Sequence, residues 1–178
     1  MMTKDLTFDF TNYNEDGFLQ IPAGRYDVVT QPWKYRTSES GNPVFHIDVE
    51  FTGGQFKGET MRYFHTIMPE EWSKGAFLRM LKEIGVVKQD DHKKGEKLTV
   101  IPLLGETDER EFTEVTHIEV NGDKRTVDGR KAVAVIVPGK DKQGNANTMI
   151  QRLEKAGSKP ASDMFGGSGS TKKSDFPV

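Results

Sequence analysis

Three segments in the first half of the chain decide the predicted fold: GRYDVVTQPWKYRT (24–37), PVFHIDVEF (43–51) and FKGETMRYFHTI (56–67). In the second segment apolar residues alternate with polar ones from Phe45 to Phe51, which is the period-two pattern of a half-buried strand. Clusters of turn-forming residues separate the three segments. We therefore expect three consecutive strands, each with one core side and one solvent side.

A helix is expected directly after the third strand. Pro69 and the acidic pair Glu70–Glu71 suit a first helical turn, because proline loses no needed hydrogen bond there and negative charge complements the helix dipole. Gly85 is a suitable stop. Between them, apolar residues recur at helical spacing: Trp72, Ala76, Phe77, Met80, Leu81 and Ile84. These residues predict one helix that is apolar on one side.

The second half of the chain reads as further strands. Residues 106–128 predict a hairpin, because Asn121–Gly122 is a strong two-residue turn signal. We interpret the region around 88–127 as an insertion that decorates the main sheet. The segment 129–137 is the most apolar strand, and residues 148–153 form the strand that returns beside it.

The chain of 178 residues is expected to hold one domain, 1–157, followed by a flexible Gly/Ser-rich tail, 158–178, that is too poor in apolar side chains to fold alone. The element order is strand, strand, strand, helix, insertion, strand, strand. That order is typical of the OB-fold, a five-stranded Greek-key barrel, here with its helix between strands 3 and 4 and an inserted hairpin. A mainly β fold with one α-helix is therefore expected.

Composition limits the function classes. The net charge of −2 excludes a histone-like basic protein, so that anion binding would need local patches. The absence of cysteine excludes disulfides, thiolate zinc sites and cysteine nucleophiles. No apolar run approaches the roughly 20 residues that span a bilayer. We expect a cytoplasmic protein without a membrane partner.

The candidate binding residues combine aromatic rings with cations. The densest cluster is Trp33, Lys34, Tyr35 and Arg36. Sequence-tolerant binding of single strands uses aromatic faces that stack on bases and cations that follow the backbone. The alternative reading is equally open: Trp33 and Tyr35 could belong to the core while Lys34 and Arg36 face water.

The third strand offers a second stacking position, because Arg62 and Phe64 share one parity on the outer side. An ordinary exposed aromatic residue paired across strands is the alternative there. Further cations could extend the positive track: Lys57, Arg130, Lys131, Lys140, Lys142 and Arg152.

Enzyme signatures are missing from the sequence. The four histidines never stand at metal-ligand spacing, and the sequence has no phosphate-binding glycine loop, dinucleotide fingerprint or nucleophile elbow. We expect no catalytic residue, no metal site and no cofactor.

Short motifs across residues 18–153 carry a family resemblance: IPAGRYDVV (21–29), SGNP (40–43), GQFKG (54–58), LKEIG (81–85), DGRK (128–131) and NTMI (147–150). Together they resemble the bacteriophage single-stranded DNA-binding proteins with an OB-fold. The resemblance implies a protein of the host cell cytoplasm that coats single-stranded DNA during replication or recombination.

The resemblance also implies a tail that recruits replication or recombination proteins. The corresponding positions here are Asp175, Phe176, Pro177 and Val178, with Asp163 further upstream. Such tails are usually strongly acidic and end in Phe, whereas this one contains Lys172 and Lys173 and ends in Val178.

Two functional hypotheses follow. The leading one is sequence-nonspecific binding of single-stranded DNA without catalysis. The alternative is a protein-interaction module, such as a phage assembly or host-takeover factor, that uses the barrel groove or the inserted hairpin.

Overall fold

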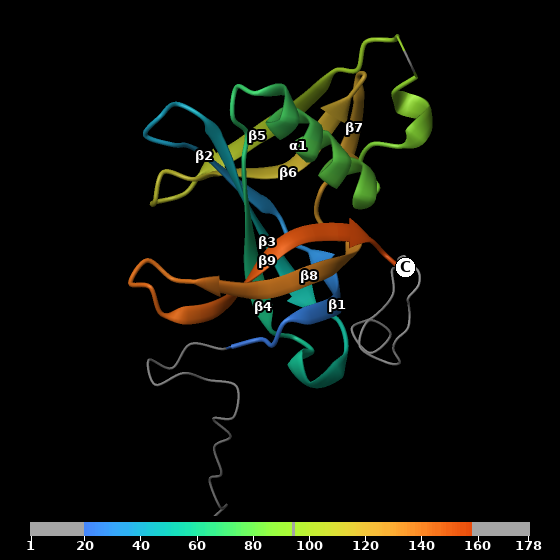
Figure 1. Ribbon diagram of the computed structural model, residues 1–178. Coiled ribbons are helices and arrows are strands. Elements are labelled where there is room, and N and C mark those ends of the chain that lie inside the picture. The colour runs from blue at the N-terminus through green and yellow to red at the C-terminus, as the bar shows by residue number, and fades with distance from the viewer. Residues whose placement is uncertain (1–19, 94, 158–178) are drawn as a thin grey trace, which may run out of the picture.

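A single antiparallel sheet and one α-helix make up the computed structural model, which describes residues 20–93 and 95–157 (Figure 1). The strands are β1 (Gly24–Thr30), β2 (Trp33–Thr37), β3 (Pro43–Phe51), β4 (Thr60–Thr66), β5 (Val100–Thr107), β6 (Thr113–Val120), β7 (Asp123–Thr126), β8 (Lys131–Lys140) and β9 (Ala146–Lys155). The helices are α1 (Glu71–Glu83) and two short 3₁₀ helices, Gly54–Phe56 and Gln89–Asp91. The prediction of a mainly β protein with one α-helix is confirmed.

The strand order is β5-β6-β2-β3-β1-β8-β9, with β4 paired to β3 and β7 paired to β6. No pairing joins β5 to β9 within the described ranges, so the sheet is not closed into a barrel. The described residues form nine strands rather than the five of the predicted barrel, because the first predicted strand is split and the insertion joins the same sheet as β5, β6 and β7.

The split of the first strand occurs at Gln31 and Pro32. Pro32 has no backbone N–H to contribute to a ladder, and the amide of Gln31 instead donates to the Asp48 carbonyl at 2.9 Å. On either side of this break the chain has different partners: β1 pairs with β3 and β8, and β2 pairs with β3 and β6. The break therefore lets one stretch of chain link both halves of the sheet.

The core lies between the inner face of the sheet and α1. Trp33 is fully buried, with its ring centroid 5.6 Å from that of Phe45 and 6.4 Å from that of Phe77 on α1. The Phe45 and Phe77 rings are stacked at 5.3 Å. β8 is buried on both faces from Ala132 to Ile136, as the pattern of residues 129–137 indicates.

The position of Trp72 differs from the prediction. We expected it on the apolar side of the helix, but its side chain is 67 % exposed. The residues of α1 that are buried are Ser73, Phe77, Met80 and Leu81, and Trp72 points away from this stripe in the first turn. Helical spacing alone did not show where the buried stripe begins.

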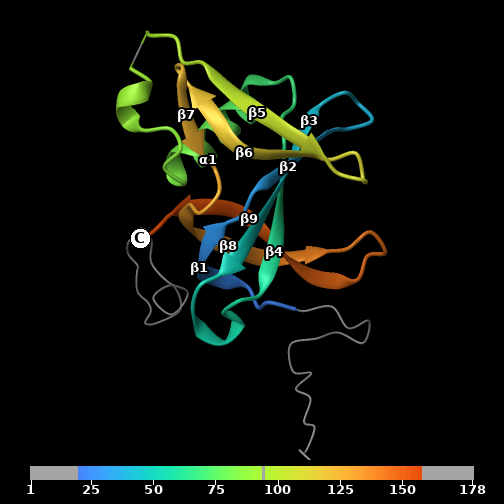
Figure 2. The same ribbon diagram turned by 180° about the vertical axis from the view of Figure 1, so that it is seen from behind.

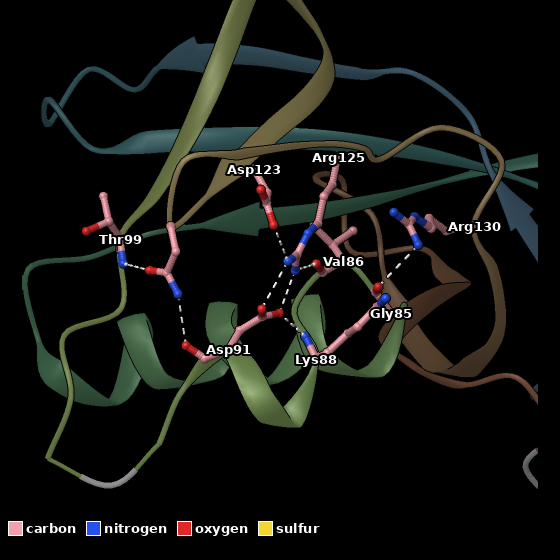
Figure 3. Close-up of polar contacts among 9 residues, drawn as sticks. Gly85, Val86, Lys88, Asp91, Thr99, Asp123, Arg125 and Arg130 are labelled. Carbon is pink, nitrogen blue, oxygen red and sulfur yellow. Dashed lines mark hydrogen bonds and ion pairs between the residues drawn. The ribbon is translucent and has the colours of Figure 1, made fainter.

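The C-terminal end of α1 is fixed by two arginines from the second half of the chain (Figure 3). Gly85 has a φ of 81°, the left-handed value that glycine adopts readily at a helix end. Arg130 Nη1 donates to the Gly85 carbonyl at 3.1 Å, and Arg125 Nη1 donates to the Val86 carbonyl at 2.9 Å. These bonds satisfy the carbonyl groups of the two residues that follow the C-cap residue Ile84 and hold the chain where it leaves the helix.

Asp91 completes this connection by receiving two bonds from the Arg125 guanidinium (Figure 3). The bonds from Arg125, followed in size by one from the Lys88 amide, lower the pKa of Asp91 to about 2. Asn121, in the β6–β7 turn, donates to the Asp91 carbonyl at 2.9 Å. The inserted hairpin therefore holds the loop that follows α1.

No helix in the described part of the chain is long and apolar enough to cross a membrane.

Candidate functional site

The sheet side opposite the core carries a row of polar and aromatic residues across β2, β3 and β4. We call it the outer face and define it by Lys34, Arg36, His46, Asp48, Arg62 and Phe64. The strand register places His46 opposite both Lys34 and Phe64, and Asp48 opposite Arg62. Residues directly opposite in antiparallel strands project to the same side, so these side chains are neighbours.

An aromatic group lies at the centre of the outer face. The His46 ring lies between Phe64, at a centroid distance of 4.7 Å, and Phe112, at 4.8 Å. Phe64 is 57 % exposed, whereas His46 is only 5 % exposed beneath it. Burial is the main reason that the pKa of His46 is lowered to about 4, and the positive charges of Arg62 and Arg36 act in the same direction. His46 is therefore neutral near neutral pH.

The cations of the outer face differ in their partners. Arg62 donates two bonds to the Asp48 carboxylate, at 2.6 and 3.0 Å, and Lys34 donates to Asp108 at 2.7 Å. Arg36 instead donates from Nε to the neutral His46 ring at 3.3 Å, and no carboxylate pairs with it among the residues that the structure describes. Arg36 is thus the cation of this face whose charge is least compensated.

The cluster Trp33–Arg36 is divided between the two sides of β2. The interpretation of Trp33 as a base-stacking residue is wrong, because Trp33 is fully buried and packs on Phe45 and Phe77. Tyr35 is half-buried, with its ring centroid 5.4 Å from that of Phe45. Lys34 and Arg36 lie on the outer face, as the alternative reading of this cluster had it.

Two of the outlying cations line separate hollows. Lys131 lines a hollow with Val28, Val29 and Ala156, and Arg152 lines a different one between β9 and α1. Arg152 is also paired with Glu154 at 2.6 Å. The strand register places Lys131 opposite Val29, and Val29 opposite Glu50, on the same side of the sheet as Asp48. The inclusion of Lys131 and Arg152 in one positive track with the outer face stays a prediction.

Lys57, Lys140 and Lys142 are exposed. The β8–β9 turn, which contains Lys142 and follows Lys140, projects to the same side of the molecule as the β2–β3 and β5–β6 turns (Figures 1 and 2). Lys57 follows the first 3₁₀ helix, after the opposite end of β3. Asp163 and the predicted partner-binding residues Asp175, Phe176, Pro177 and Val178 lie outside the described residues.

Two members of the aromatic group were missed by sequence reasoning. His46 could have been found, because its position in β3 alternates with the core residues Phe45 and Ile47. Phe112 could not, because it reaches His46 only through the pairing of β2 with β6. The ion pair between Lys34 and Asp108 joins β2 to the β5–β6 turn. In that turn, the backbone N–H of Phe112 donates to Asp108 Oδ1 at 3.0 Å.

A second feature is an apolar groove between α1 and β5, with a volume of about 540 Å³. We call it the α1–β5 groove. Leu78 and Leu81 form one wall, Leu98, Val100 and Leu104 form the other, and Tyr35 contributes at one end. Lys74 is the charged residue among those that line it. Leu104 is 58 % exposed, so that the groove opens to the surface.

Comparison with known families gives one match. Residues 6–100 match the family described as "Protein of unknown function (DUF669)". The chain belongs to this family. The matched span includes β1 to β4, α1 and the outer-face residues of β2, β3 and β4, and it ends at the first residue of β5. No curated protein matches the chain.

Metal binding gains no support from the described part of this DUF669 protein. No group of three or more His, Asp or Glu residues there is arranged to hold a metal ion. Asp48 and Asp108, the carboxylates paired with Arg62 and Lys34, are both bound to cations.

Proposed function

We propose that the protein binds single-stranded DNA without sequence preference, through the outer face, in phage DNA replication or recombination in the host cell cytoplasm. The observation that carries this proposal is the exposed Phe64 ring, which is next to Arg62 on the outer side of β4 and packs on His46, the ring to which Arg36 is bonded. An exposed ring offers a surface on which any base can stack, and neighbouring cations attract the phosphates. The proposal assigns no catalytic step to the protein.

We also propose that the central strands correspond to an OB-fold. β1–β2 would be its first strand, β3 and β4 its second and third, and β8 and β9 its fourth and fifth, with α1 between the third and fourth. Two features support this assignment: β1 pairs with both β3 and β8, and α1 directly follows β4. OB-folds bind oligonucleotides on the face of their second and third strands, which here is the outer face.

The ion pairs of the outer face set the expected strength of binding. Phosphates must compete with Asp48 for Arg62 and with Asp108 for Lys34. Among the three cations that define the outer face, Arg36 is the one expected to meet a phosphate without displacing a carboxylate of the described residues. Binding should therefore be of moderate affinity, with more of the free energy from stacking than in a strongly basic protein.

A fluorescence titration tests the proposal directly. A labelled poly-dT oligonucleotide is titrated with the protein at two salt concentrations, with the duplex as a comparison. The logarithm of the affinity should fall with the logarithm of salt concentration by about 0.7 per neutralised phosphate. Absence of binding at low salt would reject the proposal.

The α1–β5 groove favours a second candidate function, a protein-interaction module such as a phage assembly or host-takeover factor. Apolar surface that opens beside an inserted hairpin is suited to a protein partner. A pull-down from nuclease-treated host lysate separates the two functions. Partners bridged by DNA should be lost after nuclease treatment, whereas direct partners, including replication or recombination proteins that bind the tail, should be retained.

A further inference from the structure

The α1–β5 groove has the chemistry of a site for an apolar segment of chain. Its walls are leucine, valine and proline side chains, and its one charged lining residue, Lys74, is exposed on α1. Leu104 of β5, which lines the groove, is 58 % exposed. Apolar surface of this kind is stabilised when an apolar side chain covers it.

The chain itself supplies a segment that leaves the described residues at the last turn of α1, on the side of the helix that faces β9, with the groove on its other side. Near the end of the described residues, the Lys155 amide donates to Glu83 Oε2 at 2.9 Å, so the C-terminal segment leaves the domain beside the last turn of α1. From Gly157 to Asp163 an extended chain spans roughly 20 Å. That length is comparable to α1 itself, at about 1.5 Å per residue over 13 residues. Because α1 with its side chains is about 10–12 Å across, this length is enough for residues from Asp163 onward to pass around the helix to the groove.

The N-terminal segment is less well placed. It joins the domain at Ile21, whose carbonyl accepts a bond from Thr148 Oγ1 at 2.6 Å, at the start of β9. The groove instead lies at the other end of β3, where Pro43 and Phe45 contribute to it. The β1–β3 register places β1 opposite the far end of β3, at Phe51. Most of the length of β3 therefore separates the N-terminal segment from the groove.

The segment Asp163–Met164–Phe165 has the side chains that the groove requires. Two apolar side chains follow one carboxylate, and Gly166 and Gly167 come next. The carboxylate is complementary in charge to Lys74. We propose that Met164 and Phe165 dock in the α1–β5 groove of the same molecule, with Asp163 beside Lys74. This contact is independent of DNA and is measured in its absence.

A spin label tests the contact, because the native chain contains no cysteine. Ser162→Cys carries a nitroxide in an isotope-labelled chain, and the loss of backbone amide signals is recorded. We expect the signals of Leu78, Leu98 and Leu104 to be lost, while that of Phe64 on the outer face remains. The double variant Met164→Ser/Phe165→Ser should restore the groove signals. The matched tail variant Phe176→Ser/Pro177→Ser should leave them lost.

Charge reversal gives a second measurement. Lys74→Glu should restore part of the groove signals, and adding Asp163→Lys should abolish that restoration.

Each contrary result overturns the proposal. Unchanged groove signals in the labelled chain exclude docking. Signal loss that persists in Met164→Ser/Phe165→Ser excludes those side chains as the anchor. Signal loss that also occurs in a mixture of a spin-labelled chain without isotope label and an isotope-labelled chain without spin label identifies a second copy as the occupant. Signal loss at Phe64 instead of the groove places the segment on the outer face.

Discussion

Arg62 and Asp48, opposite each other on β4 and β3, form a two-bond ion pair on the outer face, with N···O distances of 2.6 and 3.0 Å. The Arg62 side chain is 34 % exposed and that of Asp48 is 27 % exposed, so both can meet a ligand. A phosphate that approaches Arg62 meets a carboxylate that already occupies its donors. The pair therefore limits how strongly this face attracts an anion.

Asp48→Asn is expected to strengthen the binding of single-stranded DNA. The substitution removes the competing negative charge but keeps an oxygen that can accept a bond from Arg62. The affinity should rise several-fold, and the salt dependence should steepen by up to about 0.7 per additional phosphate contact. Titrations at several salt concentrations measure both changes. Asp90→Asn changes the net charge equally at an exposed site in the second 3₁₀ helix and should have little effect.

Phe64→Ala is expected to weaken binding with little change in stability. Loss of one stacking position costs about 1–3 kcal/mol, which corresponds to roughly 5- to 150-fold in Kd. Trp72→Ala is the matched control, because Trp72 is 67 % exposed on α1 and does not belong to the outer face. Equal losses in the two variants would argue against Phe64 as a specific stacking residue.

Trp33→Ala is expected to reduce stability rather than binding. Removal of a fully buried aromatic side chain costs about 3–5 kcal/mol, and here it would also leave Phe45 and Phe77 without their common neighbour. Urea unfolding measures the loss. A variant as stable as the native protein that no longer binds DNA would contradict the burial of Trp33.

The burial of Trp33 shows where the strand pattern in the sequence predicts the buried side of a strand and where it does not. The alternation in β3 correctly separates Phe45 and Ile47, in the core, from His46 and Asp48, because both faces of that strand are set by an unbroken period of two. Parity fails after Pro32, where the strand breaks and changes partners. For the same reason, the sequence left Trp33 and Tyr35 undecided between core and surface.

The candidate site was predicted only where it depends on local pattern. Arg62 and Phe64 were assigned to the outer side from parity in one strand. Phe112 and Asp108 were not expected there, because the pairing of β2 with β6 depends on backbone hydrogen bonds between segments that are far apart in the sequence. The Asn121–Gly122 turn was predicted, and both residues have positive φ, but no local pattern shows which strand the hairpin joins.

His46 is expected to make stability depend on pH in the mildly acidic range. Its pKa is lowered from an ordinary value of about 6.5 to about 4, so the unfolded chain binds a proton that the folded chain excludes. This contribution is fully present above about pH 6.5 and is lost as the pH falls toward 4. In urea unfolding, His46→Gln should show a smaller loss of stability over that range. Some dependence should remain, because burial also lowers the pKa of His65.

Asp91 is expected to make the free energy of unfolding depend on pH in a more acidic range than His46 does. Its pKa of about 2 lies below the ordinary 3.8, chiefly because of the bonds from Arg125, so its stabilising contribution is present above about pH 4 and is lost as the pH falls toward 2. Asp91→Asn should lower the free energy of unfolding near neutral pH by about 1–3 kcal/mol, since hydrogen bonds to a charged group are removed. The difference from the native protein should shrink as acid protonates Asp91. The control is Asp90→Asn, whose carboxylate is outside the Arg125 pair and which should be as stable as the native protein at every pH. For Asp91→Asn, a difference in stability that stayed constant down to pH values near 2 would show that the loop after α1 does not depend on this charge.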